Sequence, residues 1–199
     1  MPDTGAPWNI PYVESSDLVS DWPADSLALA NAIDAGLDAV GGLVAVKHAL
    51  FTGTQTNSTA AGANFAVTDL SITHTLADAS NKLIISAYLG VIASSDGRAR
   101  VGLAVADDGT LIGIGDAAGT TTRVGAGFRM GTSDTNSAGN AAVTFVYEPN
   151  DTASHTFTVR AINISTGTST LYVNRHEDSS TTASYPRASS GLVIQEVKV

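Results

Sequence analysis

The chain contains four histidines, and their spacing does not indicate a metal centre. They are His48, His74, His155 and His176. Zinc sites usually draw two ligands from one short segment and often use cysteine, and this chain has no cysteine. His74 falls on the apolar side of an alternating segment, so we interpret it as a hydrogen-bonded core or subunit-contact residue. The sequence predicts no bound metal and no cofactor.

Neighbouring aspartates offer oxygen ligands of the kind that calcium prefers. Asp107 and Asp108 are adjacent, and Asp116 follows within the same stretch. Their spacing differs from that of the helix–loop–helix calcium site, which takes ligands at alternate positions and ends on a glutamate. We therefore interpret the Asp107–Asp108 pair as a solvated turn.

No set of residues predicts catalysis. Glycosidases need two placed carboxylates, and Glu148, Glu177 and Glu196 are available together with nearby aspartates, but nothing in their spacing selects a pair. The Gly-x-Ser-x-Gly elbow of serine hydrolases and the Gly-x-x-x-x-Gly-Lys phosphate loop are absent. The sequence predicts no catalytic residues and a protein that is not an enzyme.

Charge and hydropathy exclude two classes of partner. The net charge is −9, and seven acidic residues precede the first basic residue, Lys47. The arginines are scattered and form no basic patch, so we expect no nucleic-acid binding. The longest apolar run, 43–50, is interrupted by Lys47 and His48, and the first residues do not resemble a signal peptide. We expect no membrane insertion and no secretion.

Residues 1–20 are predicted to form an extended arm. This segment is rich in proline and carries large apolar side chains that include Trp8, Ile10, Tyr12 and Val13. Leaving such groups in water forfeits about 1.5–3 kcal/mol each, so we expect them to dock on a partner. The alternative is that the arm folds back over its own β domain.

A single helix is predicted after the arm. Pro23 suits the first helical position, and Gly41–Gly42 ends the apolar periodicity. The helix has one narrow apolar seam, which a single chain has limited means to cover. We therefore predict a homotrimer whose helices meet along Ala30, Ile33, Leu37 and Val40.

From residue 43 onward the sequence predicts only strands. Apolar and polar residues alternate in several runs, and Asp96–Gly97 and Asp108–Gly109 suit tight hairpin turns. The predicted strands are 43–51, 68–76, 82–93, 98–106, 121–130, 141–148, 154–163, 168–175 and 191–198. Regular strands without helices indicate a mainly β fold, a β-sandwich or jelly-roll domain over 43–199, preceded by the arm and helix of 1–42.

Loops rich in Gly, Ser, Thr and Asn are the predicted contact regions. They span 53–63, 131–140 and 176–190, with a further loop at 115–122. The loop 176–190 contains His176, Tyr185 and Arg187, which can stack on or hydrogen-bond a sugar. The alternative is a solvated loop that Tyr185 pins to the sandwich.

The N-terminal segment resembles a known family. It contains Ile10-Pro11-Tyr12, then Asp17-Leu18-Val19 and Asp21, followed by the helix. This order is similar to the N-terminal segment of bacteriophage tail-fibre and minor tail proteins, in which an arm precedes a short trimerising helix. Downstream, 81–85 and 191–197 resemble the β-sandwich tips of phage fibres. The chain lacks a shaft and repeats, which favours a short knob or a head decoration.

The resemblance implies a structural role in a virion. The expected protein is a short tail fibre, assembled in the host cytoplasm, that binds other virion proteins through 1–42. Its β-sandwich would contact the host surface, with a surface glycan as the expected ligand. A capsid decoration or head-fibre protein is the first alternative, and a free carbohydrate-binding β-sandwich is the second.

Overall fold

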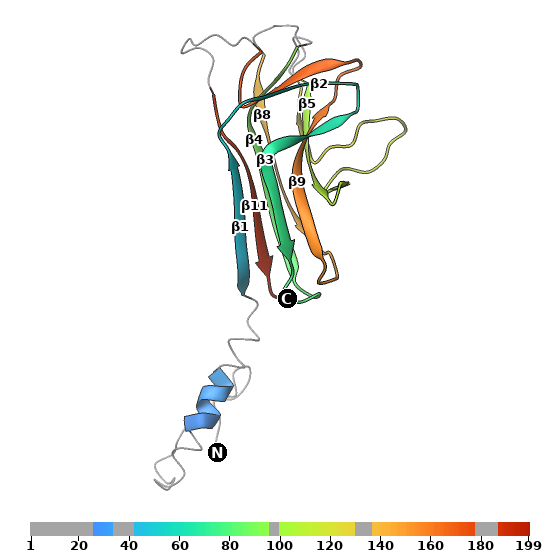
Figure 1. The fold of residues 1–199 in the computed structure, drawn as a ribbon. Coiled ribbons are helices and arrows are strands. Elements are labelled where there is room, and N and C mark those ends of the chain that lie inside the picture. Colours follow the sequence, from blue (N-terminus) through green and yellow to red (C-terminus); the bar gives the residue numbers. More distant parts are fainter. Residues whose placement is uncertain (1–25, 34–41, 96–99, 130–136, 178–186) are drawn as a thin grey trace. The chain divides into compact units, whose positions relative to one another are not determined.

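A computed structural model of the chain describes residues 26–33, 42–95, 100–129, 137–177 and 187–199 (Figure 1). The chain divides into two compact units. The first comprises Met1–Gly42 together with Val199, and the second comprises Leu43–Lys198. This division falls at the predicted domain boundary.

The described part of the first unit is a helix over 26–33. Leu27 is 62% exposed and Ile33 is 45% exposed, and Ala30 is also exposed. A helix of this length is marginal without a partner. The remaining predicted seam residues, Leu37 and Val40, lie outside the described residues, as does the arm with Trp8, Ile10, Tyr12 and Val13.

The described residues of the second unit form eleven strands. They are β1 (Leu43–Phe51), β2 (Gln55–Thr59), β3 (Asn64–Thr75), β4 (Lys82–Ser94), β5 (Val101–Asp107), β6 (Thr110–Ile112), β7 (Ala126–Phe128), β8 (Gly139–Tyr147), β9 (Ser154–Asn163), β10 (Ser169–Val173) and β11 (Ser190–Val197). They form two antiparallel sheets. One has the order β1-β11-β4-β10-β2 with β8 also paired to β4, and the other has the order β3-β9-β5-β6 with β7 also paired to β5.

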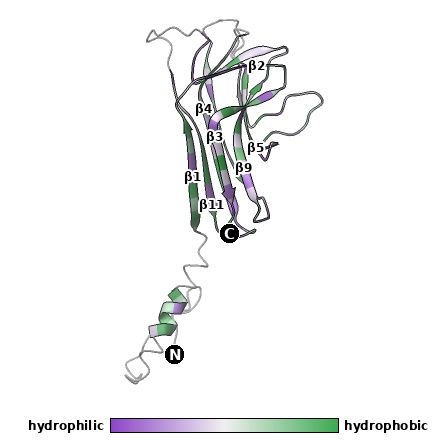
Figure 2. Cartoon of the chain, viewed as in Figure 1, coloured by the Kyte–Doolittle hydropathy of each residue, from purple (hydrophilic) through white to green (hydrophobic). Residues whose placement is uncertain are grey.

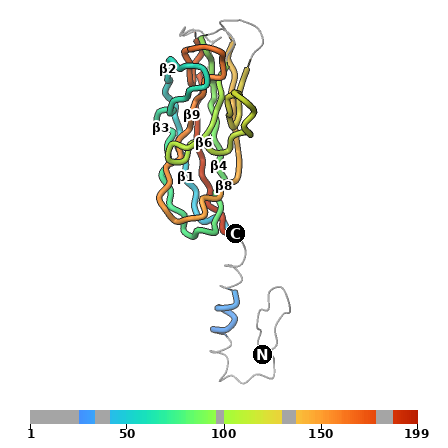
Figure 3. Tube along the Cα trace, turned by 90° about the vertical axis from the view of Figure 1, so that its right-hand side faces the viewer, coloured from blue at the N-terminus to red at the C-terminus, as the bar shows by residue number. Residues whose placement is uncertain are grey.

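The two sheets pack face to face as a β-sandwich, which confirms the predicted fold class. The long strands run along the length of the unit in both views (Figures 1 and 3). Their inward side chains form one apolar core, in which Leu70, Leu83, Leu103 and Phe157 are fully buried. The alternation of buried and exposed residues in β3 and β4 produces this arrangement, because successive side chains point to opposite faces.

Most predicted strands are present, and two corrections are needed. The predicted loop 53–63 is wrong at Gln55–Thr59, where a polar segment forms β2 and pairs with β10. The predicted strand 121–130 is reduced to Ala126–Phe128. The short strand β6 was not predicted, and Asp96–Gly97 lies outside the described residues.

The predicted Asp108–Gly109 hairpin is confirmed. Asp107 pairs with Thr110, which leaves a two-residue turn. Asp108 has φ 45° and Gly109 has φ 89°, as the mirror-image turns favoured in hairpins require. This turn places two adjacent carboxylates at one end of the sandwich.

Candidate functional site

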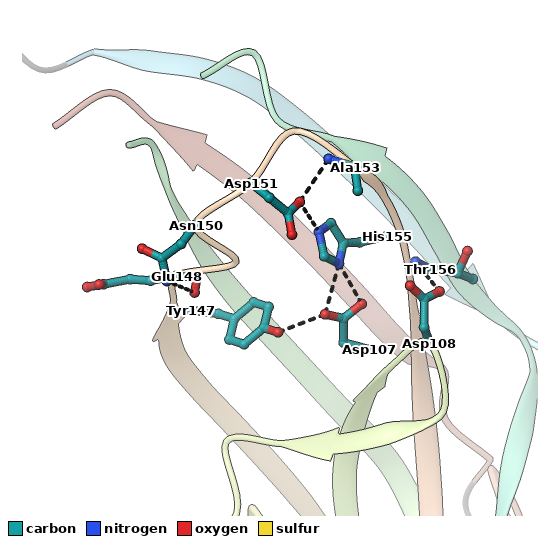
Figure 4. Close-up of polar contacts among 9 residues, drawn as sticks. All are labelled: Asp107, Asp108, Tyr147, Glu148, Asn150, Asp151, Ala153, His155 and Thr156. Carbon is teal, nitrogen blue, oxygen red and sulfur yellow. Dashed lines mark hydrogen bonds and ion pairs between the residues drawn. The ribbon is translucent and has the colours of Figure 1, made fainter. Parts of the chain in front are cut away.

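The densest cluster of titratable side chains in the described residues lies at that end of the sandwich. We call it the Asp107 cluster, and it consists of Asp107, Asp108, Tyr147, Asp151 and His155 (Figure 4). Asp107 ends β5, Tyr147 ends β8 and His155 is the second residue of β9. The cluster exists because β5 ends beside the place where β8 ends and β9, the next strand in the chain, begins.

A chain of hydrogen bonds passes through the Asp107 cluster. Tyr147 donates its hydroxyl to Asp107 Oδ2 at 2.7 Å. His155 Nδ1 lies 3.0 and 3.1 Å from the two oxygens of Asp107, and His155 Nε2 lies 2.9 Å from Asp151 Oδ1. The imidazole is therefore held between two carboxylates.

The buried ring of Phe157 holds the rings of His155 and Tyr147 in place. Phe157 is fully buried beneath the cluster. The His155 ring stacks on it with centroids 6.0 Å apart, and Tyr147 meets it edge-on, also at 6.0 Å. Because the rings pack against the core, they lose little further freedom when they form their hydrogen bonds.

The two carboxylates favour the protonated imidazole. Burial opposes the charge, but the hydrogen bonds to Asp151 and Asp107 outweigh it and raise the pKa of His155. The hydrogen bond from His155 lowers the pKa of Asp151 in turn, with help from the Ala153 N–H. Burial and the hydrogen bond to Asp107 raise the pKa of Tyr147 to about 12, so the phenol stays protonated at physiological pH.

Asp108 completes the site from the hairpin turn. Its Oδ1 accepts the backbone N–H of Thr156 at 3.0 Å. One ligand atom from each of Asp107, Asp108 and His155 lies within 4.8 Å of the others. Two carboxylates and an imidazole suit a divalent transition metal, and these three residues could hold one if His155 Nδ1 exchanged its contact with Asp107 for the ion.

The position of the aspartates corrects part of the sequence interpretation. Asp107 is 8% exposed, so it is a buried partner of His155 and Tyr147 and not a solvated turn residue. Asp108 is exposed, as expected for a turn. Asp116, considered with them as a calcium ligand, is exposed and is not part of the cluster.

The Asp107 cluster is built to hold strands together more than to react. The described contacts of His155 engage both ring nitrogens with carboxylates and not with a hydroxyl that it could activate. Tyr147 is a donor whose raised pKa keeps its proton in place. The arrangement ties β5, β8 and β9 at their ends.

A second histidine–carboxylate pair lies inside the sandwich. His74 Nε2 lies 2.9 Å from Glu196 Oε2, and Glu196 Oε1 accepts Asn81 Nδ2 at 2.6 Å and the Ala77 N–H at 2.8 Å. Burial would raise the pKa of Glu196, but these hydrogen bonds and His74 lower it. His74 is 4% exposed, which confirms its interpretation as a hydrogen-bonded core residue.

The carboxylates considered for a glycosidase have other partners. Glu196 is enclosed by the His74 pair, and the exposed Glu148 pairs with Lys82 Nζ at 2.7 Å. The structure does not bring these two glutamates to one site.

The predicted host-contact residues are only partly accessible. His176 is 4% exposed, so its ring is not available to a ligand as the prediction required. Arg187 is exposed, and Tyr185 lies outside the described residues. The prediction that His176 contacts the host is therefore wrong.

Sequence reasoning missed the pairing of His155 with Asp107. Tyr147, Asp151 and His155 lie close together in sequence, around the connection of β8 to β9, but their four-residue intervals are typical of a helix face and do not indicate a site between strands. Asp107 lies far from them in sequence and joins them only through the pairing of β5 with β9.

No protein family matches the chain, and no curated protein sequence matches it. Within the described residues, no helix is long and apolar enough to span a membrane.

Proposed function

We propose that this chain is a non-enzymatic structural protein of a bacteriophage particle, a short fibre that attaches through residues 1–42 and displays its β-sandwich to the host surface. The observation that carries the proposal is the division into two units of different character. One unit completes its own core. The other contributes a short helix with exposed apolar residues.

The helix supports the anchoring role because its exposed apolar side chains need a binding partner to cover them. Leu27 and Ile33 are largely exposed on a helix too short to be stable alone. In the proposed homotrimer, the helices of the copies meet along the seam of Ala30, Ile33, Leu37 and Val40. The acidic arm, with Trp8, Ile10, Tyr12 and Val13, docks on another virion protein.

The sandwich supports the display role through its rigidity. The Asp107 cluster closes one end of the second unit, and the His74–Glu196 pair connects β3 to β11. A tip that is exposed on a particle benefits from such crosslinks, since this chain has no disulfides. Host contact is assigned to loop residues such as Tyr185 and Arg187, with a glycan as the ligand.

The test is incorporation of the chain into particles. A variant lacking residues 1–41 should retain its β circular dichroism and be absent from purified virions, whereas the full chain is present. Immunogold labelling then places the full chain on the tail. Normal incorporation of the shortened variant contradicts the anchor, label on the head supports a decoration protein, and absence of label supports a free carbohydrate-binding module.

A further inference from the structure

One outer face of the sandwich presents apolar side chains, although the outer face of a solvated sheet normally presents polar ones. It is formed by β1, β11, β4 and β8, and we call it the outer apolar face. Its most exposed members are Val44, Val46, Leu50, Tyr88 and Val146, with exposed fractions between 38% for Tyr88 and 59% for Val146. Figure 2 shows hydrophobic colouring along β1, interrupted near its middle.

Strand register makes these residues neighbours. Val46 lies opposite Gln195, Gln195 opposite Ile84, and Ile84 opposite Val146, so one row crosses all four strands. A parallel row runs from Leu50 through Gly191 and Tyr88 to Ala142.

An aromatic ring covers the centre of the second row. A Cβ at Gly191 would collide with the ring of Tyr88, so the ring lies across Gly191, between Tyr88 and Leu50 in the register. A flat, partly exposed tyrosine amid aliphatic side chains is typical of the centre of a protein interface.

The outer apolar face carries almost no charge, although the chain has a net charge of −9. The groups on it that can carry charge are His48, Lys82 and Glu148, and Lys82 Nζ pairs with Glu148 Oε1 at 2.7 Å. Seven of the 19 acidic residues precede Lys47, so the residues of the sandwich are close to charge balance. A contact through the outer apolar face takes few charged groups out of water, which keeps its desolvation cost low.

The opposite sheet shows how this sandwich covers a wet face. Hydroxyl side chains line the outward side of β3 and β9, where Ser71 pairs with Thr158 and Thr73 with Thr156, each at 3.3 Å. The outer apolar face has one such pair, Ser86 with Thr144 at 2.9 Å, between its two apolar rows. Exposed Val, Leu and Tyr therefore distinguish the outer apolar face from an ordinary solvated sheet.

We infer that the outer apolar face is the surface through which the β-sandwiches of different copies of this chain contact one another. The inference rests on the proposed homotrimer, because the chain enters β1 directly from the anchoring segment. Copies joined through that segment hold their β1 strands on short tethers, which raises their effective concentration. In the described part of the chain β1 pairs only with β11, so its other edge is open to a neighbour.

The first test places charge on the face of the full chain. A variant with Val46→Lys and Val146→Lys should weaken self-association at least tenfold, whereas a control with Ser71→Lys and Thr75→Lys on β3 should not. Light scattering coupled to size exclusion measures the mass against the single-chain 20.3 kDa. Circular dichroism checks that both variants are folded. Unchanged association in the Val46/Val146 variant overturns the inference.

A helix variant separates this inference from the proposed trimer. If Leu27→Lys with Ile33→Lys dissociates the protein while the face variant does not, the trimer stands and the outer apolar face is not its interface. If the unaltered chain has the mass of one copy at tens of micromolar, both the trimer and the face are overturned.

Crosslinking gives a second readout if the lysine variant does not fold. The chain has no cysteine, so a single Val46→Cys introduces the only thiol. A short bis-maleimide should join Val46→Cys chains into dimers and leave Thr75→Cys chains single. Equal crosslinking of the two variants, or no crosslinking of either, contradicts the inference.

Discussion

Replacing His155 with glutamine should release the end of the sandwich without disturbing its core. Glutamine fills a similar volume but cannot carry charge between Asp107 and Asp151. The His155 side chain is only 12% exposed, and its ring stacks on Phe157. The variant therefore tests whether the protonated imidazole stabilises the fold.

The bond between His155 and Asp107 sets the expected magnitude. The side chain of Asp107 is 9% exposed, and a hydrogen bond to a charged group in such a place contributes about 1.5–3 kcal/mol. The bond to Asp151 adds little because that carboxylate is half exposed and screened by water. We expect His155→Gln to lower the free energy of unfolding by about 2 kcal/mol at pH 6.

The effect should decrease as the pH rises. Burial opposes charge on His155, but its bonds to Asp151 and Asp107 raise its folded pKa above the ordinary value. The folded state thus binds the proton more tightly, and its contribution is complete below about pH 6.5 and lost as the pH rises through the folded pKa. In that window the unaltered chain should lose up to about 1.4 kcal/mol per pH unit from this group.

Urea unfolding followed by circular dichroism at several pH values between 5.5 and 9 measures both effects. His48→Gln, which removes an exposed histidine on β1, is the control. The difference between His155→Gln and the unaltered chain should shrink toward pH 9. A difference that stays constant, or grows with pH, refutes the assignment of an imidazolium held by Asp107.

Two further substitutions test the interior. Glu196→Gln should lower the free energy of unfolding by about 2–3 kcal/mol at pH 7. Burial raises the pKa of Glu196, but its hydrogen bonds lower it, so the unaltered chain should lose this stabilisation as the pH falls through the folded pKa. In acid, the free energy of unfolding of the variant should therefore depend less on pH than that of the unaltered chain. Leu103→Ala, at a fully buried position of β5, should cost about 2–5 kcal/mol in urea unfolding, and a value below about 1 kcal/mol would mean that the two sheets do not pack on this side chain.

The sequence predicts the strands well where one face is buried. In β3 and β9 the alternation of apolar and polar residues is a local pattern, and it identifies the strand and its inward face together. The segment Gln55–Thr59 lacks this pattern because it is polar throughout. Its strand character comes from pairing with β10, which no local pattern reports.

The polar sites were less predictable for the same physical reason. The inward position of His74 could be read from the pattern of β3, but its partner Glu196 lies 122 residues away. Asp107 and His155 are separated by 48 residues. Both pairs depend on which strands become neighbours, and the local alternation pattern does not report that arrangement.

The pairing of β1 with β11 has a bearing on how this protein is synthesised. The first strand of the sandwich lies against the last, with Leu43 opposite Val197. A ribosome must therefore release the chain through β11 before β1 gains its partner. Until then its valines and leucines, and the unpaired His74, remain open to chaperones or to neighbouring nascent chains. Termination within β11 should thus yield insoluble protein and not a smaller folded domain, because β11 completes the sandwich by pairing with both β1 and β4.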